Sequence, residues 1–223
     1  MKKNEYINNF RNADLIEFEK TICTKEKYLL IKRFLDIFFS VILIAILMVP
    51  MIVIALIIYI EDRKSPFFLQ KRVAKNGKIF RIIKFRSMKI TLKGDSVTVN
   101  NDNRITKVGK FIRDYRLDEL PQLFNILKGD MSFVGARPEI PKYVEYYTDD
   151  MLATLLLPVG LTSRASIMFK DEATLLSQTD NIDETYVSQI LPQKMKYNIE
   201  YINKVSFLED TKIAILTVKE VFF

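Results

Sequence analysis

The 223-residue sequence contains no histidine, one cysteine and only six glycines. Without histidine the chain has no Ser-His-Asp triad, no histidine general base and no histidine-ligated zinc site. The lone Cys23 excludes an internal disulfide and a cysteine-rich metal site. No glycine falls in the GxGxxG or GxxxxGKS/T patterns that bind nucleotides. Any catalysis must therefore use carboxylates, lysines, hydroxyls or a hard metal ion such as Mg²⁺.

The overall composition is that of a folded protein that attracts anions. Hydrophobic residues make up 49% of the chain and charged residues 27%, which excludes a disordered or collagen-like protein. Lysine and arginine outnumber aspartate and glutamate by 34 to 27, giving a net charge of +7. This balance favours lipid headgroups, nucleotides or nucleic acid as partners, and charge alone does not choose among them.

Residues 37–60 form an uncharged segment that only Ser40, Pro50 and Tyr59 interrupt. About 20 apolar residues suffice to cross a bilayer, so we interpret the segment as a membrane helix. A buried core helix is the less favoured alternative, because helices of soluble proteins usually keep a polar face.

Pro50 lies near the middle of this segment, where it removes one helical hydrogen bond and clashes with the preceding turn. The two arms would measure about 20 Å and about 15 Å, so each matches about one leaflet of a ~30 Å hydrocarbon core. Basic residues flank both ends, and the positive-inside tendency therefore places both ends in the cytoplasm. A helix that enters the bilayer, breaks at Pro50 and returns satisfies this condition, whereas a straight crossing does not.

Asn76-Gly77 predicts a type I′ β-hairpin between segments 66–74 and 78–88. The strands also carry many basic residues, among them Lys84 and Arg86. These charges could simply solvate an outer face. Directly after a membrane segment, we expect them also to meet anionic headgroups or a phosphate. Residues 93–103 are expected to form a polar loop.

Two short helices are expected after this loop. The second begins near Asp118, carries Pro121 in its first turn, where the missing N–H costs little, and stops at Gly129. The first presents one apolar face, made of Val108, Phe111, Ile112 and Tyr115.

The remainder predicts helices over 138–157 and 184–203, with a short extended segment at 132–134. Ser206 and Glu209 form a capping-box pattern for a last helix that either packs on the core or lies on the membrane. The expected fold class is α+β, mainly helical: a monotopic membrane protein with a Pro-broken re-entrant helix, a basic β-hairpin and interfacial amphipathic helices. Its expected parts are a polar N-terminal segment (1–30), the re-entrant membrane helix (31–62) and a domain lying on the membrane (63–223).

Opposite charges gather between residues 113 and 122. Asp118 and Glu119 stand side by side at an expected helix start, with Arg113 and Arg116 just upstream. Arg113 and the helix N-terminus would hold Asp118 ionised and would also attract a phosphate. Neighbouring helical residues point in different directions, so we expect different roles for the two carboxylates rather than a symmetric dyad. From spacing alone, Asp118 and Glu119 are more readily explained as ordinary acidic residues at a helix N-terminus than as catalytic residues.

Three motifs together resemble one family of membrane enzymes. They are Lys32-Arg33-Phe-Leu-Asp36 before the apolar helix, Lys84-Phe-Arg-Ser-Met88, and the block from Leu117 to Pro138, which includes Asp-Glu-Leu-Pro-Gln and Gly-Ala-Arg-Pro. The sequence is similar to the bacterial sugar transferases, the monotopic polyprenyl-phosphate sugar-1-phosphate transferases or phosphoglycosyl transferases. The resemblance extends from Lys32 to the C-terminus.

The resemblance implies a reaction. Family members pass sugar-1-phosphate from a nucleoside diphosphate sugar, usually a UDP-sugar, to polyprenyl (undecaprenyl) phosphate and release UMP. It implies Asp118 as a nucleophile that forms a covalent phosphosugar-enzyme, with Mg²⁺ bound beside its carboxylate, and Glu119 as a second acidic residue. Phosphoryl transfer asks for positioning and positive charge, which Arg113 and Arg137 would supply as phosphate clamps.

The resemblance also implies a setting. The catalytic domain would lie on the cytoplasmic face of the bacterial inner membrane and carry out the first membrane step of capsule, O-antigen, exopolysaccharide or glycoprotein synthesis. Lys84 and Arg86 would add positive charge for substrate phosphates, and inner-leaflet lipids would be partners. Nucleic acid is not expected as a partner, because base-reading motifs are missing, and a homodimer is left open.

Two segments depart from the family pattern. Gly-Pro-Arg-Pro is replaced by Gly135-Ala-Arg-Pro138, and Arg-Pro-Gly-Ile-Thr by Pro158-Val-Gly-Leu-Thr162. Arg164 is a hypothetical substitute for the arginine missing at 158. These departures leave open a catalytically idle membrane-anchored scaffold of the same fold. A basic peripheral module that only binds lipid or nucleic acid ranks last.

Overall fold

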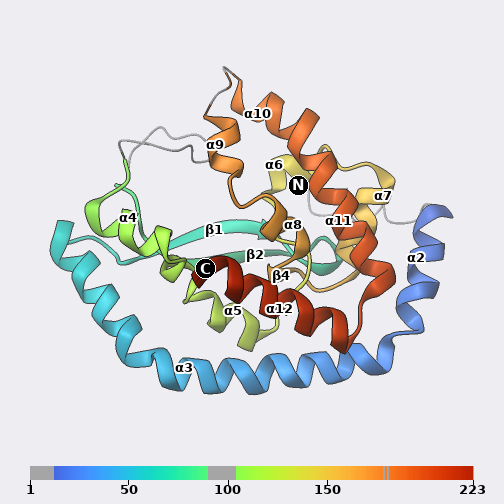
Figure 1. Ribbon diagram of the computed structural model, residues 1–223, viewed down its shortest axis with the longest axis horizontal. Coiled ribbons are helices and arrows are strands. Elements are labelled where there is room, and N and C mark those ends of the chain that lie inside the picture. The colour runs from blue at the N-terminus through green and yellow to red at the C-terminus, as the bar shows by residue number, and fades with distance from the viewer. Residues whose placement is uncertain (1–12, 90–103, 178, 180, 223) are drawn as a thin grey trace.

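The computed structural model describes residues 13–89, 104–177, 179 and 181–222. This part of the chain is mainly helical, with two small sheets and one long apolar helix near the N-terminus (Figure 1). The loop predicted over 93–103 and the first twelve residues lie outside the described part. The elements are α2 (Ala13–Cys23), α3 (Glu26–Asp62), β1 (Phe67–Val73), η2 (Lys75–Gly77), β2 (Ile79–Phe85), α4 (Lys107–Asp114), η3 (Leu117–Glu119), α5 (Gln122–Lys128), β3 (Ser132–Val134), α6 (Pro141–Val144), α7 (Asp149–Leu152), η4 (Ala153–Leu156), β4 (Gly160–Thr162), α8 (Arg164–Met168), α9 (Glu172–Leu176), α10 (Ile182–Thr185), η5 (Tyr186–Ile190), α11 (Leu191–Lys204) and α12 (Phe207–Phe222).

The apolar segment lies within α3, a 37-residue helix that is long and apolar enough to cross a membrane. It begins at Glu26, earlier than the predicted residue 31, and ends at Asp62 as predicted. The helix continues through Pro50 instead of separating into two arms. A proline inside a helix removes one hydrogen bond and bends the helix without necessarily ending it. Figure 1 shows α3 as a curved helix along one side of the molecule.

One face of α3 packs on the rest of the protein and the other is apolar and exposed. Phe34, Val49 and Ile60 on the outer side are 66%, 69% and 63% exposed. This is the pattern of a helix that meets protein on one side and lipid on the other. The buried residues, spaced close to multiples of the helical repeat, are Lys32, Asp36, Ser40, Ile44, Met51 and Ile58.

Arg33 fixes α3 to the end of α5. Its Nη1 and Nη2 donate to the carbonyls of Ile126 and Leu127 at 2.6 and 2.8 Å. These carbonyls belong to the last turn of α5, where the i+4 N–H partners of a continuing helix are missing and a cation is favoured; the Ile126 carbonyl also accepts from the Gly129 N–H at 3.0 Å. Gly129 ends α5 with a φ of 91°, which confirms the predicted helix stop.

Lys32 and Asp36 attach the same part of α3 to two other elements. Lys32 forms a buried ion pair with Asp210 of α12, and the Asp210 carboxylate also accepts from the Tyr28 hydroxyl at 2.5 Å. Asp36 accepts hydrogen bonds from the Ser132 hydroxyl and the Phe133 N–H of β3, both at 3.1 Å. The basic motif at the start of the apolar helix therefore joins α3 to α5, β3 and α12.

The other end of α3 is tied to the hairpin. Arg86, which follows β2, donates to both carboxylate oxygens of Asp62 at 2.5 and 2.6 Å and is 5% exposed. Both ends of α3 thus bond to one and the same domain. The helix lies along that domain, packed against α5, instead of projecting from it (Figure 1).

The predicted hairpin is confirmed. β1 and β2 pair antiparallel, with Phe67 opposite Phe85 and Val73 opposite Ile79. Asn76 and Gly77 have φ values of 57° and 70°, the positive values that a type I′ turn requires at both central residues.

β3 and β4 form a short parallel pair that brings two glycines into backbone contact. A Cβ on Gly135 would lie 2.3 Å from the Pro158 carbonyl oxygen, and a Cβ on Gly160 would lie 2.2 Å from the Gly135 nitrogen. Any side chain would therefore push the strands apart. This close approach fixes the segments on either side of Arg137.

Two helix predictions are wrong in part. Residues 138–157 do not form one helix but the short helices α6, α7 and η4. Ile140 and Thr148 have extended backbone conformations, so a new helix begins after each of them. On α4, Ile112 is buried as predicted, whereas Phe111 and Tyr115 are 58% and 53% exposed. These two rings contact each other on the surface at an interplanar angle of 50°, with their centroids 5.0 Å apart.

The C-terminal helices are confirmed. α10, η5 and α11 form a continuous helical stretch over 182–204, and the Ser206 hydroxyl accepts from the Glu209 N–H at 3.3 Å. Ile213 of α12 is fully buried, so α12 packs on the core.

Candidate active site

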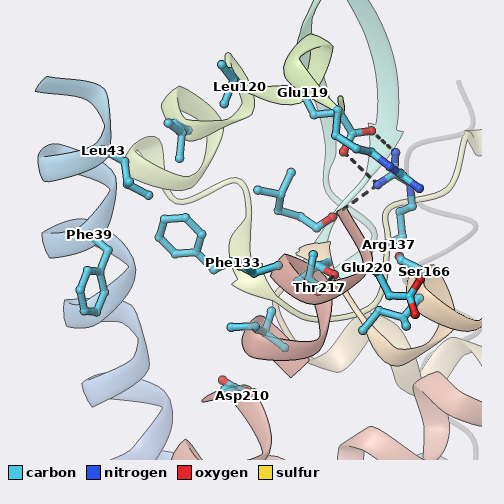
Figure 2. Close-up of a pocket in the computed structure, with 18 of the residues that line it drawn as sticks. Phe39, Leu43, Glu119, Leu120, Phe133, Arg137, Ser166, Asp210, Thr217 and Glu220 are labelled. Carbon is cyan, nitrogen blue, oxygen red and sulfur yellow. Dashed lines mark hydrogen bonds and ion pairs between the residues drawn. The ribbon is translucent and has the colours of Figure 1, made fainter. Parts of the chain in front are cut away.

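A cavity of about 1010 Å³ lies between α3, η3, the β3–β4 pair, α8 and α12 (Figure 2). Charged side chains gather in one part of its lining. Five of the residues predicted from the sequence are brought together here: Lys84, Arg113, Asp118, Glu119 and Arg137.

The two neighbouring carboxylates lie on η3, a single tight turn between α4 and α5. Arg116 precedes this turn with a φ of 56°, a left-handed conformation that is uncommon for a residue with a side chain. Such conformations cost of order 1–3 kcal/mol and collect at functional sites. The reversal at Arg116 directs the chain so that both carboxylates line the cavity.

Glu119 is fully engaged by two cations. The Lys84 ammonium lies 2.8 Å from Oε1, and Arg137 donates to both carboxylate oxygens, with Nη1 3.3 Å from Oε2. Burial opposes ionisation, but Arg137 and Lys84 hold the pKa of Glu119 well below its usual value. Glu119 is therefore a fixed anion that orients the two cations.

Arg137 is held from two sides. Besides Glu119, its Nη1 donates to the Leu161 carbonyl of β4 at 3.4 Å. The Glu119 carboxylate raises the pKa of Arg137, which stays cationic. Its position follows from the glycine contact described above, because Gly135 and Gly160 bring the two strands of this corner together.

Asp118 differs from its neighbour. It is half-buried, lines the cavity and, among the described residues, forms no ion pair or hydrogen bond. Burial and the adjacent Glu119 carboxylate raise the pKa of Asp118, against the attraction of Lys84 and Arg113. Arg113 lowers the pKa of Asp118, as predicted, but burial and Glu119 raise it by more. Of the two neighbouring carboxylates of η3, Glu119 is thus paired and Asp118 has no ion-pair partner in the described part of the chain.

Two arginines considered from the sequence do not line the cavity. Arg86 is taken up by Asp62 at the end of α3, so its role as a phosphate ligand is not supported. Arg164, the hypothetical substitute for the arginine missing at 158, donates its Nε to Glu209 of α12 at 2.5 Å. Both are structural cations whose charge is already balanced.

Another part of the cavity is apolar. Phe39 and Leu43 of α3 face Leu120 of the segment before α5 and Phe133 of β3 (Figure 2). This apolar lining connects the charged end of the cavity to α3.

Several residues near Arg137 carried no signal in the sequence. Ser166, Lys170, Thr217 and Glu220 line the cavity because α8 and the end of α12 meet there. Behind the site, Glu139 is 5% exposed and accepts from the Tyr186 hydroxyl at 2.6 Å. Single serines, threonines and a glutamate without a motif cannot be assigned to a site before the tertiary contacts are known.

The donor set fits a Mg²⁺ ion only if the substrate completes it. No group of three or more His, Cys, Asp or Glu residues suited to a metal occurs in the described chain. Mg²⁺ in phosphate-transfer sites is usually bound by one or two carboxylates together with substrate phosphates and water. The unpaired Asp118 carboxylate meets that requirement.

Comparison with known proteins places the chain in a family. A family model described as bacterial sugar transferase matches residues 27–223. Galactosyl transferase CpsE of Streptococcus agalactiae serotype III is 37% identical over 216 residues, which cover 88% of this chain and 43% of that protein. UDP-N-acetylgalactosamine-undecaprenyl-phosphate N-acetylgalactosaminephosphotransferase of Aeromonas hydrophila is 34% identical over 200 residues, which cover 87% of this chain and 44% of the relative.

A third relative is UDP-glucose:undecaprenyl-phosphate glucose-1-phosphate transferase of Escherichia coli K12. It is 33% identical over 194 residues, which cover 85% of this chain and 39% of that protein. The chain thus spans less than half the length of each of these three relatives.

Proposed function

Because the chain belongs to the bacterial sugar transferase family, we propose that it transfers sugar-1-phosphate from a UDP-sugar to polyprenyl (undecaprenyl) phosphate. The observation that carries the proposal is the difference between the two neighbouring carboxylates. Glu119 is paired with Arg137 and Lys84, whereas Asp118, in the same cavity, has no ion-pair partner among the residues that the structure describes. One carboxylate is free to react, and the other holds the cations that neutralise a diphosphate.

In the first step, a carboxylate oxygen of Asp118 attacks the β-phosphorus of the UDP-sugar. A bond forms between this oxygen and phosphorus, and the bond from phosphorus to the oxygen bridging the two phosphates breaks. UMP leaves with that oxygen and its electron pair. Arg137 and Arg113 supply positive charge for the phosphate oxygens, which is the main requirement of phosphoryl transfer.

In the second step, an oxygen of polyprenyl phosphate attacks the same phosphorus. The bond between phosphorus and Asp118 breaks, which regenerates the carboxylate and yields a polyprenyl diphosphate sugar. A covalent intermediate divides one difficult displacement into two easier ones. The apolar lining around Phe39, Leu43 and Phe133 would take the first isoprene units, because it continues into the exposed apolar face of α3.

Mg²⁺ is proposed as the cofactor, held by the Asp118 carboxylate together with substrate phosphate oxygens. When bound, it would offset the negative charge of the diphosphate. The protein's own contribution is to keep Glu119 paired, so that this carboxylate does not repel the phosphates.

The membrane arrangement is proposed to be monotopic, with α3 re-entrant and the catalytic domain on the cytoplasmic face of the inner membrane. Ion pairs attach both ends of α3 to one domain, through Lys32 with Asp210 and through Arg86 with Asp62. A helix that crossed the bilayer would carry one of its ends to the other face, away from the domain. The exposed apolar side of α3 would face lipid.

The proposal is tested with purified protein, undecaprenyl phosphate, Mg²⁺ and a panel of UDP-glucose, UDP-galactose and UDP-N-acetylgalactosamine. We expect UMP release and a lipid-linked product from at least one of them. The Asp118→Asn variant is expected to release none. Failure of the wild-type protein with a broad panel would instead support the catalytically idle scaffold.

A further inference from the structure

Three hydroxyl side chains form one wall of the cavity next to Arg137. They are Thr162 of β4, Ser166 of α8 and Thr217 of α12, here called the hydroxyl wall. Figure 2 shows Ser166 and Thr217 near Arg137, across from Phe39 and Leu43 of α3. The wall begins one residue after Leu161, whose carbonyl accepts from Arg137.

The hydrogen bonds within the wall run in a definite direction. The Thr217 hydroxyl donates to the Ile213 carbonyl at 2.8 Å, and Thr162 Oγ1 lies 2.7 Å from Thr217 Oγ1. Since the Thr217 proton is already used, Thr162 is the donor of the second bond. The two oxygens therefore keep acceptor capacity on a surface that lines the cavity.

Ser166 adds a third hydroxyl, and its position is fixed by Ser163. The Ser163 hydroxyl accepts from the Ser166 N–H at 3.0 Å, and the two hydroxyl oxygens lie 3.0 Å apart. Beyond Ser166, the polar lining continues to Lys170 and Glu220, whose exposed side chains form an ion pair at 2.6 Å. This side of the cavity therefore offers both donors and acceptors out to its mouth.

We propose that the hydroxyl wall binds hydroxyl groups of the nucleotide sugar, an inference that rests on the proposed function. A diphosphate held by Arg137 carries two polyhydroxylated substituents, the sugar and the ribose, and one of them must extend along the adjoining surface. The apolar surface around Phe39 and Leu43 is unsuited to such a group, whereas the Thr162 and Thr217 oxygens can accept hydrogen bonds from its hydroxyls. The wall thus makes Ser166 and Thr217 substrate-binding residues.

The bond between Thr162 and Thr217 also joins β4 to α12, so a purely structural role must be distinguished. Thr217→Val keeps the shape of the side chain and removes the hydroxyl, whereas Thr217→Ser keeps the hydroxyl. Thr21→Val is the matched control. Thr21 of α2 makes the same type of bond to a carbonyl four residues earlier, that of Glu17 at 3.1 Å, and does not line the cavity.

Binding of UDP-glucose, UDP-galactose, UDP-N-acetylgalactosamine and UMP is measured by equilibrium dialysis in the Asp118→Asn background. No turnover is needed there, so an idle enzyme would not obscure the result. We expect Thr217→Val to weaken binding of at least one UDP-sugar about three- to tenfold, the effect of one lost hydrogen bond. Thr217→Ser and Thr21→Val should bind as the parent does.

Comparing the four ligands shows whether the wall binds hydroxyls of the sugar or of the ribose. If the wall binds the sugar, the loss differs among the three UDP-sugars and UMP binding is unchanged. If it binds the ribose, the loss is the same for all three and for UMP. Unchanged affinity for every ligand in Thr217→Val, or an equal loss in Thr217→Ser, would overturn the proposal. Absence of UMP release from the wild-type enzyme would count against the proposed function alone.

Discussion

Arg137 and Glu119, 18 positions apart in the chain, form a two-point ion pair inside the cavity, with Nη2 bonded to Oε1 and Nη1 to Oε2. Lys84 reaches the same carboxylate from β2. This arrangement gives the second acid of the Asp-Glu motif an electrostatic task. It also explains how two adjacent carboxylates can have different chemistry.

Asp118→Asn is expected to lower the rate of UMP release by about 10³-fold or more, since it removes the attacking oxygen. Because Asp118 forms no ion pair within the described chain, the thermal midpoint should change little. UMP release and a circular dichroism melt check both points. Asp150→Asn, an exposed aspartate of α7, is the matched control. Normal turnover by Asp118→Asn would refute the nucleophile assignment.

Arg137→Lys is expected to lower kcat/KM about 10- to 100-fold, because an ammonium cannot bond both Glu119 oxygens and a phosphate together. Combined with Glu119→Gln, it should show a coupling free energy of about 1–3 kcal/mol, since the two side chains act as a unit. Steady-state kinetics of the two single variants and the double variant measure this value. Additive losses would show that the pair is not functionally linked.

The acid limb of the pH profile should report Asp118. Its pKa is raised by burial and by Glu119, so kcat/KM should fall with decreasing pH at an inflection above the ordinary aspartate value of 3.8. Glu119→Gln removes one negative neighbour and frees Lys84 and Arg137, which favours ionised Asp118. The inflection should therefore move to lower pH. A shift to higher pH would contradict this electrostatic account.

Arg86 and Lys84 are two residues apart, but we expect their substitution to affect different quantities: stability for Arg86 and the KM for the UDP-sugar for Lys84. Arg86→Ala leaves Asp62 unpaired, so we expect a loss of about 1–3 kcal/mol in stability and an unchanged KM for the UDP-sugar. Lys84→Met removes a cation from the cavity and should raise that KM. Thermal melts and initial rates compare the two. A raised KM in Arg86→Ala would instead indicate that Arg86 binds a substrate phosphate.

Both ends of α3 should face the same side of the membrane. In a Cys23→Ser background, Lys27→Cys and Lys64→Cys place single thiols before and after the apolar segment, and Ser177→Cys marks the catalytic domain. All three should react with an impermeant maleimide in inverted vesicles and none in spheroplasts. Labelling of Lys27→Cys or Lys64→Cys alone in spheroplasts would indicate a straight crossing.

Features specified by a few adjacent residues could be predicted from the sequence. Asn76-Gly77 determines the hairpin turn, Gly129 the end of α5 and Ser206 the start of α12, because each acts through its own backbone conformation or a neighbouring N–H. The charged end of the cavity was also predictable, since Arg113, Asp118 and Glu119 are close in the chain.

Features that depend on distant partners could not be predicted. Arg86 looked like a phosphate ligand because its partner Asp62, 24 positions away, bonds it only in the folded protein. Ser166 and Thr217 reach one cavity through the packing of α8 and α12, which no local pattern specifies. The helix predicted over 138–157 failed because extended residues at 140 and 148 divide the segment into shorter helices.

The bonds of Arg33 to the last carbonyls of α5 have a mechanical consequence. Together with the ion pairs at both ends of α3, they attach the proposed membrane anchor to the proposed catalytic domain at several points along its length. In the proposed membrane-bound state, bilayer thickness would then set the tilt of the whole enzyme rather than that of one helix. The height of residue 118 above the lipid phosphates, and with it access to the acceptor, would follow the composition of the surrounding leaflet.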